Sequence, residues 1–134
     1  MTDNVSIVEK VYADFARGDI PSVLAVLDDK IEWFEAEGNP YWSGAPATGP
    51  QQVVEQVFAR IPQDYDGFTI GVRRVVGLGD SVLMEGRYTG AGTATGRPMD
   101  VQVAHLWEFR DGKAIRWQQY VDTAGMRHVL GDPL

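Results

Sequence analysis

The chain lacks cysteine altogether, and its 134 residues carry twelve Lys and Arg against nineteen Asp and Glu. Without cysteine there are no disulfides, thiolate nucleophiles, cysteine-ligated zinc sites or iron–sulfur clusters. The net charge of −7 and the lack of a basic cluster beyond Arg73-Arg74 argue against binding to a nucleic-acid backbone. No apolar run approaches the ~20 residues of a membrane span. We therefore expect neither nucleic acid nor membrane as a partner.

The N-terminus is acidic and lacks the cationic and then apolar order of a secretory signal, so we expect a cytoplasmic protein. Hydrophobic residues make up 44% of the chain and aromatic residues 10%, which is a globular composition. A chain of this length is expected to form one domain, over residues 1–134, that buries a core without disulfides.

Hydrophobic periodicity predicts the order of the elements. Helices are expected over about 4–17, then after an Asp19 cap, and between Pro50 and Pro62, with a strand over 31–35 before the third helix. From residue 68 to residue 121, apolar residues alternate in four runs, which predicts an antiparallel four-strand meander. Helices segregated from a mostly antiparallel sheet are the α+β pattern. A curved sheet folded over three helices leaves a hollow, and small ligands usually bind in such hollows.

Several segments resemble a known family when taken together. They are Phe15-Ala16-Arg17-Gly18-Asp19, Ile31-Glu32-Trp33, Gly49-Pro50, Ala104-His105-Leu106-Trp107, Asp111-Gly112-Lys113 and Gln119-Tyr120-Val121-Asp122-Thr123-Ala124. Over nearly the whole chain this pattern resembles the SnoaL-like branch of the NTF2-like superfamily, which is related to ketosteroid isomerases. The resemblance implies a cone in which three N-terminal helices pack on a curved, mostly antiparallel sheet and enclose a pocket. The scaffold hosts cyclases, isomerases, hydrolases and proteins without assigned activity, so the resemblance leaves the reaction open.

The resemblance also matches functional positions of these enzymes to residues of this chain. The tyrosine of ketosteroid isomerases on the first helix falls on Val11, and Tyr12, one position on, is turned by roughly 100° around the helix. Their aspartate base falls on Glu35 and their aspartic acid on His105. The acid–base aspartate of SnoaL-type cyclases falls at or near Gln119, which cannot exchange a proton. Neither mechanism is therefore reproduced whole.

Three residues are the candidates for catalysis. His105 lies on an otherwise apolar strand face, so it is either satisfied within the core or faces a cavity, and the resemblance favours the cavity. Glu35 shares a face with Ile31 and Trp33 by parity, where desolvation would raise the pKa of its carboxyl; otherwise it lies in solvent beyond the strand. Asp122 either caps a short terminal helix or turns inward at a bulge.

A second set of residues is expected to line the hollow and hold a small hydrophobic ligand, although burial in an ordinary core is the alternative for its aromatic members. The set is Tyr12, Phe15, Trp33, Met84, Tyr88, Trp107, Trp117 and Gln119. The two histidines, His105 and His128, lack the spacing of a zinc site, and no dinucleotide or Walker motif is present. We therefore expect no metal and no cofactor.

Two functions are consistent with these residues. The first is a cofactor-independent isomerase, lyase or hydrolase that acts on a small polyketide- or steroid-like substrate. In this enzyme Glu35 moves the proton, while His105 and Gln119 stabilise negative charge on the substrate oxygen. The alternative is a non-catalytic ligand-binding or accessory module of the same fold, favoured by the departures at Val11 and Gln119.

The outer face of the predicted meander mixes apolar with polar residues. Ala104, Leu106 and Tyr120 lie on it by parity. Such a face suits a symmetric interface, and members of the family that the chain resembles are commonly homodimers. The expected partners are therefore a small hydrophobic ligand and a second copy of the chain.

Overall fold

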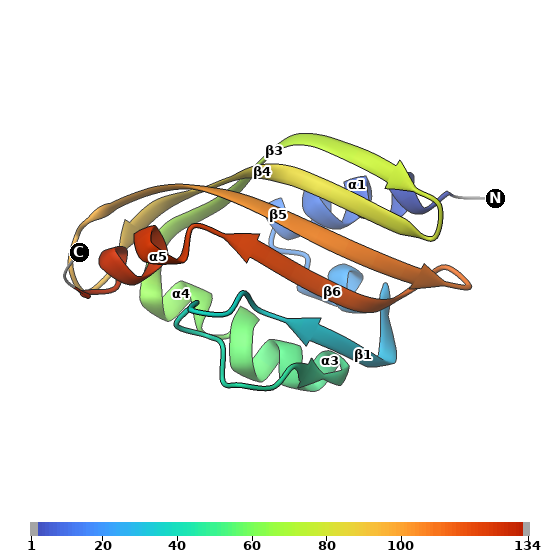
Figure 1. Ribbon diagram of the computed structural model, residues 1–134, viewed down its shortest axis with the longest axis horizontal. Coiled ribbons are helices and arrows are strands. Elements are labelled where there is room, and N and C mark those ends of the chain that lie inside the picture. Colours follow the sequence, from blue (N-terminus) through green and yellow to red (C-terminus); the bar gives the residue numbers. More distant parts are fainter. Residues whose placement is uncertain (1–2, 133–134) are drawn as a thin grey trace.

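The computed structural model describes residues 3–132 and follows the predicted order of elements closely (Figure 1). The chain begins with helices α1 (Asn4–Ala16) and α2 (Ile20–Leu24) and strand β1 (Leu27–Phe34). After these come β2 (Ala47–Thr48), α3 (Gly49–Val53), η1 (Val54–Phe58), α4 (Ile61–Asp64), β3 (Tyr65–Leu78), β4 (Ser81–Gly92), β5 (Pro98–Arg110), β6 (Lys113–Val121) and α5 (Thr123–Val129). Within residues 3–132, none of the helices is both long enough and apolar enough to cross a membrane.

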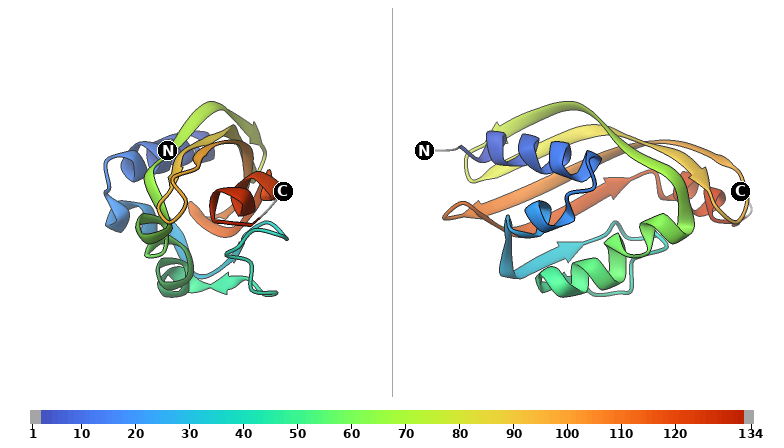
Figure 2. Two further views of the ribbon diagram at one scale, coloured as in Figure 1. Left: turned by 90° about the vertical axis from the view of Figure 1, so that its left-hand side faces the viewer. Right: turned by 180° about the vertical axis from the view of Figure 1, so that it is seen from behind.

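The six strands form one curved, unclosed sheet in the order β2-β1-β6-β5-β4-β3. Strands β3 to β6 are the predicted antiparallel meander, and β1 joins it in parallel with β6, so the sheet is mixed. Helices α1 to α4 cover one face, and α5 lies at the end of the sheet near the C-terminus (Figure 2). The α+β class predicted from the sequence is thus confirmed.

Helix α1 shows how the sequence sets up one wall of the molecule. The side chain of Asp3 accepts a hydrogen bond from Ser6 N at 2.8 Å and so caps the first turn. Val8, Val11 and Tyr12 are buried on one side of the helix, because residues three and four apart share a face. This side packs toward β3 and β4.

The third predicted helix is the element that the sequence describes least well. Instead of one helix ended by Pro62, the structure has α3, the π-helical η1 and α4 in succession. Pro62 lies in the first turn of α4, where its missing N–H removes no helical hydrogen bond. In η1, Ala59 N donates to Val54 O at 2.8 Å across five residues. The wider turn carries the side chains of Val57 and Phe58 to the interior cavity.

The curve of the sheet depends on glycine where β3 crosses β4. A Cβ at Gly86 would collide with the carbonyl oxygen of Gly71, so the two strands approach more closely than side chains permit. The register between the two strands shifts between Val72 and Arg74, which adds a local bend. The bent strands and the helices that cover them form the walls of a cavity.

Candidate functional site

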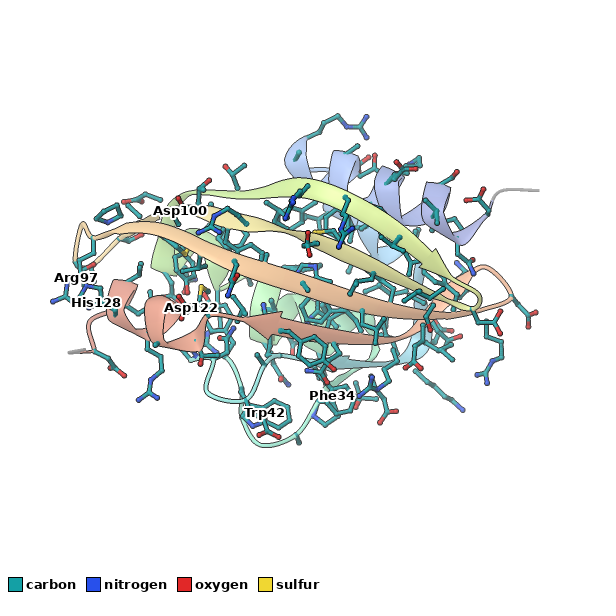
Figure 3. The ribbon with its side chains drawn as sticks, turned by 45° about the horizontal axis from the view of Figure 1, so that its top comes forward. Phe34, Trp42, Arg97, Asp100, Asp122 and His128 are labelled. Atoms are coloured by element: carbon teal, nitrogen blue, oxygen red, sulfur yellow. The ribbon has the colours of Figure 1, made fainter. Side chains whose placement is uncertain are left out.

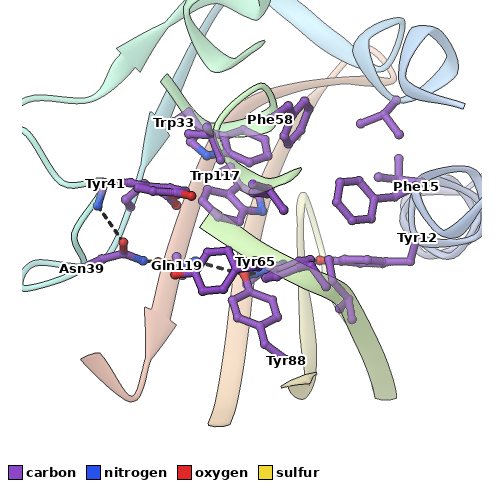
Figure 4. A pocket seen from close by; sticks show the side chains of 18 of the residues that line it. Tyr12, Phe15, Trp33, Asn39, Tyr41, Phe58, Tyr65, Tyr88, Trp117 and Gln119 are labelled. Carbon is purple, nitrogen blue, oxygen red and sulfur yellow. Dashed lines mark hydrogen bonds between the residues drawn. The ribbon is translucent and has the colours of Figure 1, made fainter. Parts of the chain in front are cut away.

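A cavity lies between the helix-covered face of the sheet and the helices. Its volume, as accessible to the centre of a water molecule, is about 50 Å³, and aromatic and aliphatic side chains form most of its wall (Figure 4). It brings together most of the residues selected from the sequence: Tyr12, Phe15, Trp33, Glu35, Tyr88, His105, Trp107, Trp117 and Gln119.

Two predicted residues lie outside this cavity. Asp122 is exposed and caps α5, since its Oδ1 accepts a hydrogen bond from Gly125 N at 3.0 Å (Figure 3). Of the two alternatives for Asp122, the structure therefore shows the helix cap, and a catalytic role at this cavity does not fit its position. Met84 is fully buried and pairs with His105 in the β4–β5 ladder, but it belongs to the core and not to the cavity wall.

A row of hydrogen-bonded side chains crosses the cavity wall, and we name it the His105 chain: Trp107, Tyr12, His105, Tyr88 and Gln119. Tyr12 Oη lies 2.6 Å from His105 Nδ1, and Tyr88 Oη lies 2.5 Å from His105 Nε2. Trp107 Nε1 donates to Tyr12 Oη at 3.0 Å, and Gln119 Nε2 donates to Tyr88 Oη at 3.0 Å. Burial lowers the pKa of His105 to about 3, so the imidazole is neutral near pH 7.

Tyr12 provides a tyrosine hydroxyl on helix α1, although the family resemblance matches the tyrosine position of ketosteroid isomerases to Val11. The match places the helix-one tyrosine on Val11, and in the structure Val11 and Tyr12 both line the cavity from α1. The turn of ~100° between neighbouring residues still leaves both on the buried side of the helix. The long side chain of Tyr12 then reaches His105 on β5.

The far end of the His105 chain is held by the loop after β1. Gln119 Oε1 accepts hydrogen bonds from Ala36 N at 3.2 Å and from Asn39 Nδ2 at 2.7 Å. Asn39 Oδ1 in turn accepts from Tyr41 N at 2.8 Å (Figure 4). Because backbone N–H groups only donate, these contacts fix which end of each amide is oxygen.

Glu35 follows β1 directly and turns its side chain into the cavity. The residue is only 6% exposed, so of the two positions that the sequence left open, the interior one is correct. Burial raises the pKa of Glu35 to about 8, while the indole of Trp33 and the positive charge of Arg60 act in the opposite direction. A carboxyl group near neutrality is suited to take or give a proton.

Four residues that line the cavity carry buried polar atoms without partners, and we name them the Glu35 corner: Glu35, Trp33, Trp117 and Tyr65. Glu35 Oε2, both indole Nε1 atoms and Tyr65 Oη are buried without a hydrogen-bond partner among residues 3–132. The two indoles stack with ring centroids 3.8 Å apart. Buried polar groups are nearly always paired, so this concentration is unusual and marks a place for a ligand or for water.

Sequence reasoning missed several residues of the wall. Asn39 and Tyr41 come from the turn-rich loop after β1, and Tyr65 opens β3 after α4. Arg60 lies beside them, with its guanidinium carbon 4.1 Å from the centre of the Tyr41 ring. Loop residues carry no periodicity, so the only available signal was the density of aromatic residues around predicted turns. Over the described range 3–132, no group of three or more acidic or histidine side chains is placed to hold a metal ion.

Comparisons with known proteins agree with this fold. A family model described as the SnoaL-like domain matches residues 8–117. An NTF2-like protein from Burkholderia thailandensis is 30% identical, with 98% of this chain and 100% of that chain covered and a TM-score of 0.93. TerC, co-crystallized with polyporic acid, is 26% identical, with 96% and 98% covered and a TM-score of 0.84. No curated protein sequence gives a match.

One further structure shares the fold. It is described as a SnoaL-like polyketide cyclase from Jannaschia sp. CCS1 and is 18% identical, with 98% of this chain and 93% of that chain covered and a TM-score of 0.83. At that identity the likeness concerns the fold alone. The curved sheet and its helices are those of an NTF2-like protein, as in the Burkholderia thailandensis structure. Within that class, the chain belongs to the SnoaL-like family, and the resemblance drawn from the sequence is confirmed.

Proposed function

We propose that the protein is a cofactor-independent enzyme of the isomerase or lyase kind, which moves a proton on a small hydrophobic carbonyl compound. The observation that supports this most is the carboxyl of Glu35, which is buried in an apolar cavity with Oε2 unpaired among the described residues. Structural carboxylates are normally paired when buried. A buried carboxyl kept unpaired is typical of a group that exchanges protons with a ligand.

The surroundings of Glu35 suit proton abstraction next to a carbonyl group. With a pKa of about 8, the carboxylate is a stronger base than an exposed glutamate, because it is poorly solvated. The apolar wall keeps water away from the carbanion or enolate that forms. The His105 chain lies in the same cavity and provides hydrogen-bond donors for the developing negative charge on the substrate oxygen.

The volume of the cavity limits the size of the substrate. About 50 Å³ is room for a few water molecules, so a polyketide- or steroid-sized compound enters only if part of the wall moves. The half-buried side chains of Phe15, Phe58 and Phe68 are the parts of the wall where we expect this movement. The structure of TerC with polyporic acid supports the view that this fold takes organic ligands of that kind.

Deuterium exchange tests the proposal. Small ketones and β-diketones are incubated with the protein in D2O, and exchange at the carbon next to the carbonyl is followed by NMR. Glu35→Gln is expected to lower the exchange rate by roughly 10²- to 10⁴-fold, while Glu37→Gln, an exposed neighbour, leaves it unchanged. The rate rises with pH up to about 8, because the base acts when ionised. Equal rates for the two variants would reject Glu35 as the base.

A non-catalytic ligand-binding module is the second candidate function. Two observations favour it: the neutral imidazole of His105 has both nitrogens engaged, and Gln119 cannot transfer protons. If this function is correct, a ligand remains bound through purification and is recovered unchanged. Mass spectrometry of the denatured protein distinguishes the two functions, because an enzyme returns product as well as substrate.

The assembly and location of the protein are also proposals. We propose a homodimer formed through the outer sheet face, where Tyr120 is 56% exposed beside the half-buried Ala104 and Leu106. Sedimentation at micromolar concentration is expected to give twice the chain mass, and a monomer would reject this. A cytoplasmic location remains a prediction from the sequence.

A further inference from the structure

The loop after β1 forms part of the cavity wall without being part of the sheet. In the described part of the chain, no backbone–backbone hydrogen bond joins residues 36–46 to another element. Inside the loop, Asn39 N donates to Ala36 O at 3.0 Å, and Trp42 N donates to Asn39 O at 2.9 Å. Residues 36–42 therefore form a unit that is bonded within itself, and we name it the 36–42 loop.

Side chains attach this loop to the elements around it. On the side of the sheet, Asn39 Nδ2 donates to Gln119 Oε1 at 2.7 Å. On the side of the helices, Tyr41 Oη donates to Asp64 Oδ2 at the end of α4, also at 2.7 Å. The guanidinium carbon of Arg60 lies 4.1 Å from the centre of the same tyrosine ring, within the range of a cation–π contact. A segment attached in this way can leave without breaking the backbone hydrogen bonds of the fold.

The chain just beyond the 36–42 loop is suited to bend. Ser43, Gly44 and Ala45 are exposed, and Gly44 has a φ of 95°. A Cβ at this glycine would contact nothing within 4 Å, so no packing fixes the backbone there. Exposed loop segments of this kind absorb the backbone rotation when a loop opens.

We propose that the 36–42 loop is a lid, which swings away from α4 to admit water and ligands to the Glu35 corner, and that Tyr41 is its latch. Asn39 and Tyr41 reach into the cavity from this loop (Figure 4), and Glu35 directly precedes it. Displacement of the loop therefore opens the cavity next to the carboxyl. An enzyme and a ligand-binding module need this access equally, so the lid does not depend on the proposed function.

The rival route into the cavity lies between α1 and β3. Tyr12 and Ile70 line both the cavity and a groove on the outside, so the wall there is one side chain thick. The hydrogen bonds of Tyr12 to His105 and Trp107 are buried, and opening this wall leaves those groups without partners. The latch bond of the lid is only half-buried, so water replaces both partners when the lid opens.

Hydrogen exchange of the indole N–H groups tests the lid in the unliganded protein. Trp33 Nε1 is buried without a partner in the described part of the chain, so its proton exchanges once water reaches the Glu35 corner. Trp107 Nε1 donates to Tyr12 and is the internal control, because it exchanges only when the His105 chain opens. The four tryptophans are labelled with 15N, assigned by single replacements with phenylalanine, and followed by NMR in D2O.

A disulfide can lock the lid, because the chain has no cysteine of its own. A Cβ at Gly38 would lie 3.4 Å from Thr123 Cβ at the start of α5, close to the ~3.5–4.5 Å found between the Cβ atoms of disulfides. In the variant with Gly38→Cys and Thr123→Cys, oxidation is expected to slow the exchange at Trp33 by more than about tenfold and to leave Trp107 unchanged. The reduced form of the same variant is the matched control, since it carries the same strain at residue 38.

Tyr41→Phe tests the latch without a disulfide. This change deletes the hydrogen bond to Asp64 and keeps the ring against Arg60. Exchange at Trp33 is expected to become faster by roughly tenfold to a hundredfold, the effect of one hydrogen bond to a charged group. Tyr120→Phe removes a hydroxyl from the outer sheet face, and we expect it to leave the exchange rate as it is. An unchanged rate in Tyr41→Phe would reject Tyr41 as the latch.

Acrylamide quenching extends the test from water to an organic molecule. With Trp42→Phe added, the three remaining indoles all line the cavity. The bimolecular quenching constant, which takes the fluorescence lifetime into account, is expected to be several-fold lower in the oxidised disulfide variant than in its reduced form. Equal quenching constants, or equal exchange at Trp33 in the two forms, would overturn the lid and favour the route between α1 and β3. A change shared by Trp107 would indicate unfolding of the whole domain and would overturn it as well.

Discussion

The His105 chain and the Glu35 corner lie in one cavity and are equally buried, but they differ in how their hydrogen bonds are satisfied. Every polar side chain of the His105 chain has a partner at 3.0 Å or less within the cavity wall. In the Glu35 corner, four buried polar atoms have no partner among residues 3–132. The two groups contact the same interior space.

This difference separates the side chains that hold the core together from those that we expect to react with a ligand. A buried network in which every side chain has a partner costs little to maintain and specifies one arrangement of the core. Unpaired buried groups lower stability, by about 1–3 kcal/mol each, and they are retained where a ligand completes their bonding. A histidine on an apolar strand is the sharpest signal in the sequence, but the structure places it within the paired row. The Glu35 corner is where we expect the chemistry.

The largest expected effect is a gain in stability when the ionisable carboxyl of Glu35 is removed. The folded-state pKa of Glu35, about 8, exceeds the 4.5 of an ordinary glutamate, so the folded state prefers the protonated form. The free energy of unfolding therefore falls as pH rises from about 4.5 to about 8. Glu35→Gln removes this fall and is expected to be more stable by roughly 3–5 kcal/mol at pH 8, from ~1.4 kcal/mol per pKa unit. Urea unfolding at pH 5 and pH 8 measures it, and parallel curves for the variant and the parent would contradict it.

Removing an anchor of the His105 chain is expected to have a comparable effect of opposite sign. Trp107 is 1% exposed and donates to Tyr12, so Trp107→Ala leaves a cavity and an unpaired oxygen and costs about 3–5 kcal/mol. Trp42, in the loop after β1, is only half-buried and packs on Phe34 with ring centroids 6.4 Å apart (Figure 3). Trp42→Ala is expected to lower the free energy of unfolding much less. Calorimetry compares the two variants, and equal losses of stability would show that Trp107 is not a core residue.

A smaller loss is expected where the His105 chain joins the loop. Gln119→Leu keeps the volume but leaves Asn39 Nδ2 and Ala36 N without their acceptor, which costs about 2–4 kcal/mol. Gln118→Leu, on the adjacent and half-buried position, is the control and changes stability by less than ~1 kcal/mol. Chemical unfolding measures this difference. An unchanged midpoint for Gln119→Leu would show that the hydrogen bonds between the His105 chain and the loop do not stabilise the fold.

The smallest effect on stability is expected at Tyr65 in the Glu35 corner. Tyr65→Phe deletes a hydroxyl that is unpaired in the described part of the chain, so no hydrogen bond is lost and stability changes by less than ~1 kcal/mol or rises. Tyr88→Phe, which deletes a hydroxyl with two partners, is expected to cost more than Tyr65→Phe. Equal melting temperatures for these two variants would remove the distinction between the two groups.

Alternation and turn chemistry were enough to predict most of the fold. The run from Val101 to Phe109 and the Asp111-Gly112 turn lie where the pattern places them, since residue 111 has φ 51° and residue 112 has φ 77°. The π-helical turn at Val54–Phe58 has no such signature, because its extra residue is selected by packing and not by local preference. Hence the third helix was predicted as one piece.

The site was predicted only in part, because alternation shows which side chains face the interior but not what they contact. Parity placed Glu35 and His105 inside, and both are buried. Parity says nothing about partners, so the sequence could not show that the imidazole is fully paired while the carboxyl is not. Nor could it find Asn39 and Tyr65, which reach the cavity from loop and strand ends. The role of Asp122 was open in the sequence because a helix cap and a strand end coincide at that residue.

The titration of the Glu35 carboxyl tests the central claim most directly. In glutamate-labelled protein, the 13C signal of this carboxyl is assigned by its loss in Glu35→Gln and followed from pH 3 to pH 10. We expect a midpoint of about 8, far above the 4.5 of an ordinary glutamate. A midpoint between pH 4 and pH 5 would show that bulk water solvates the carboxylate, and Glu35 would then be an ordinary solvated residue and not the proton-transfer group of an apolar cavity.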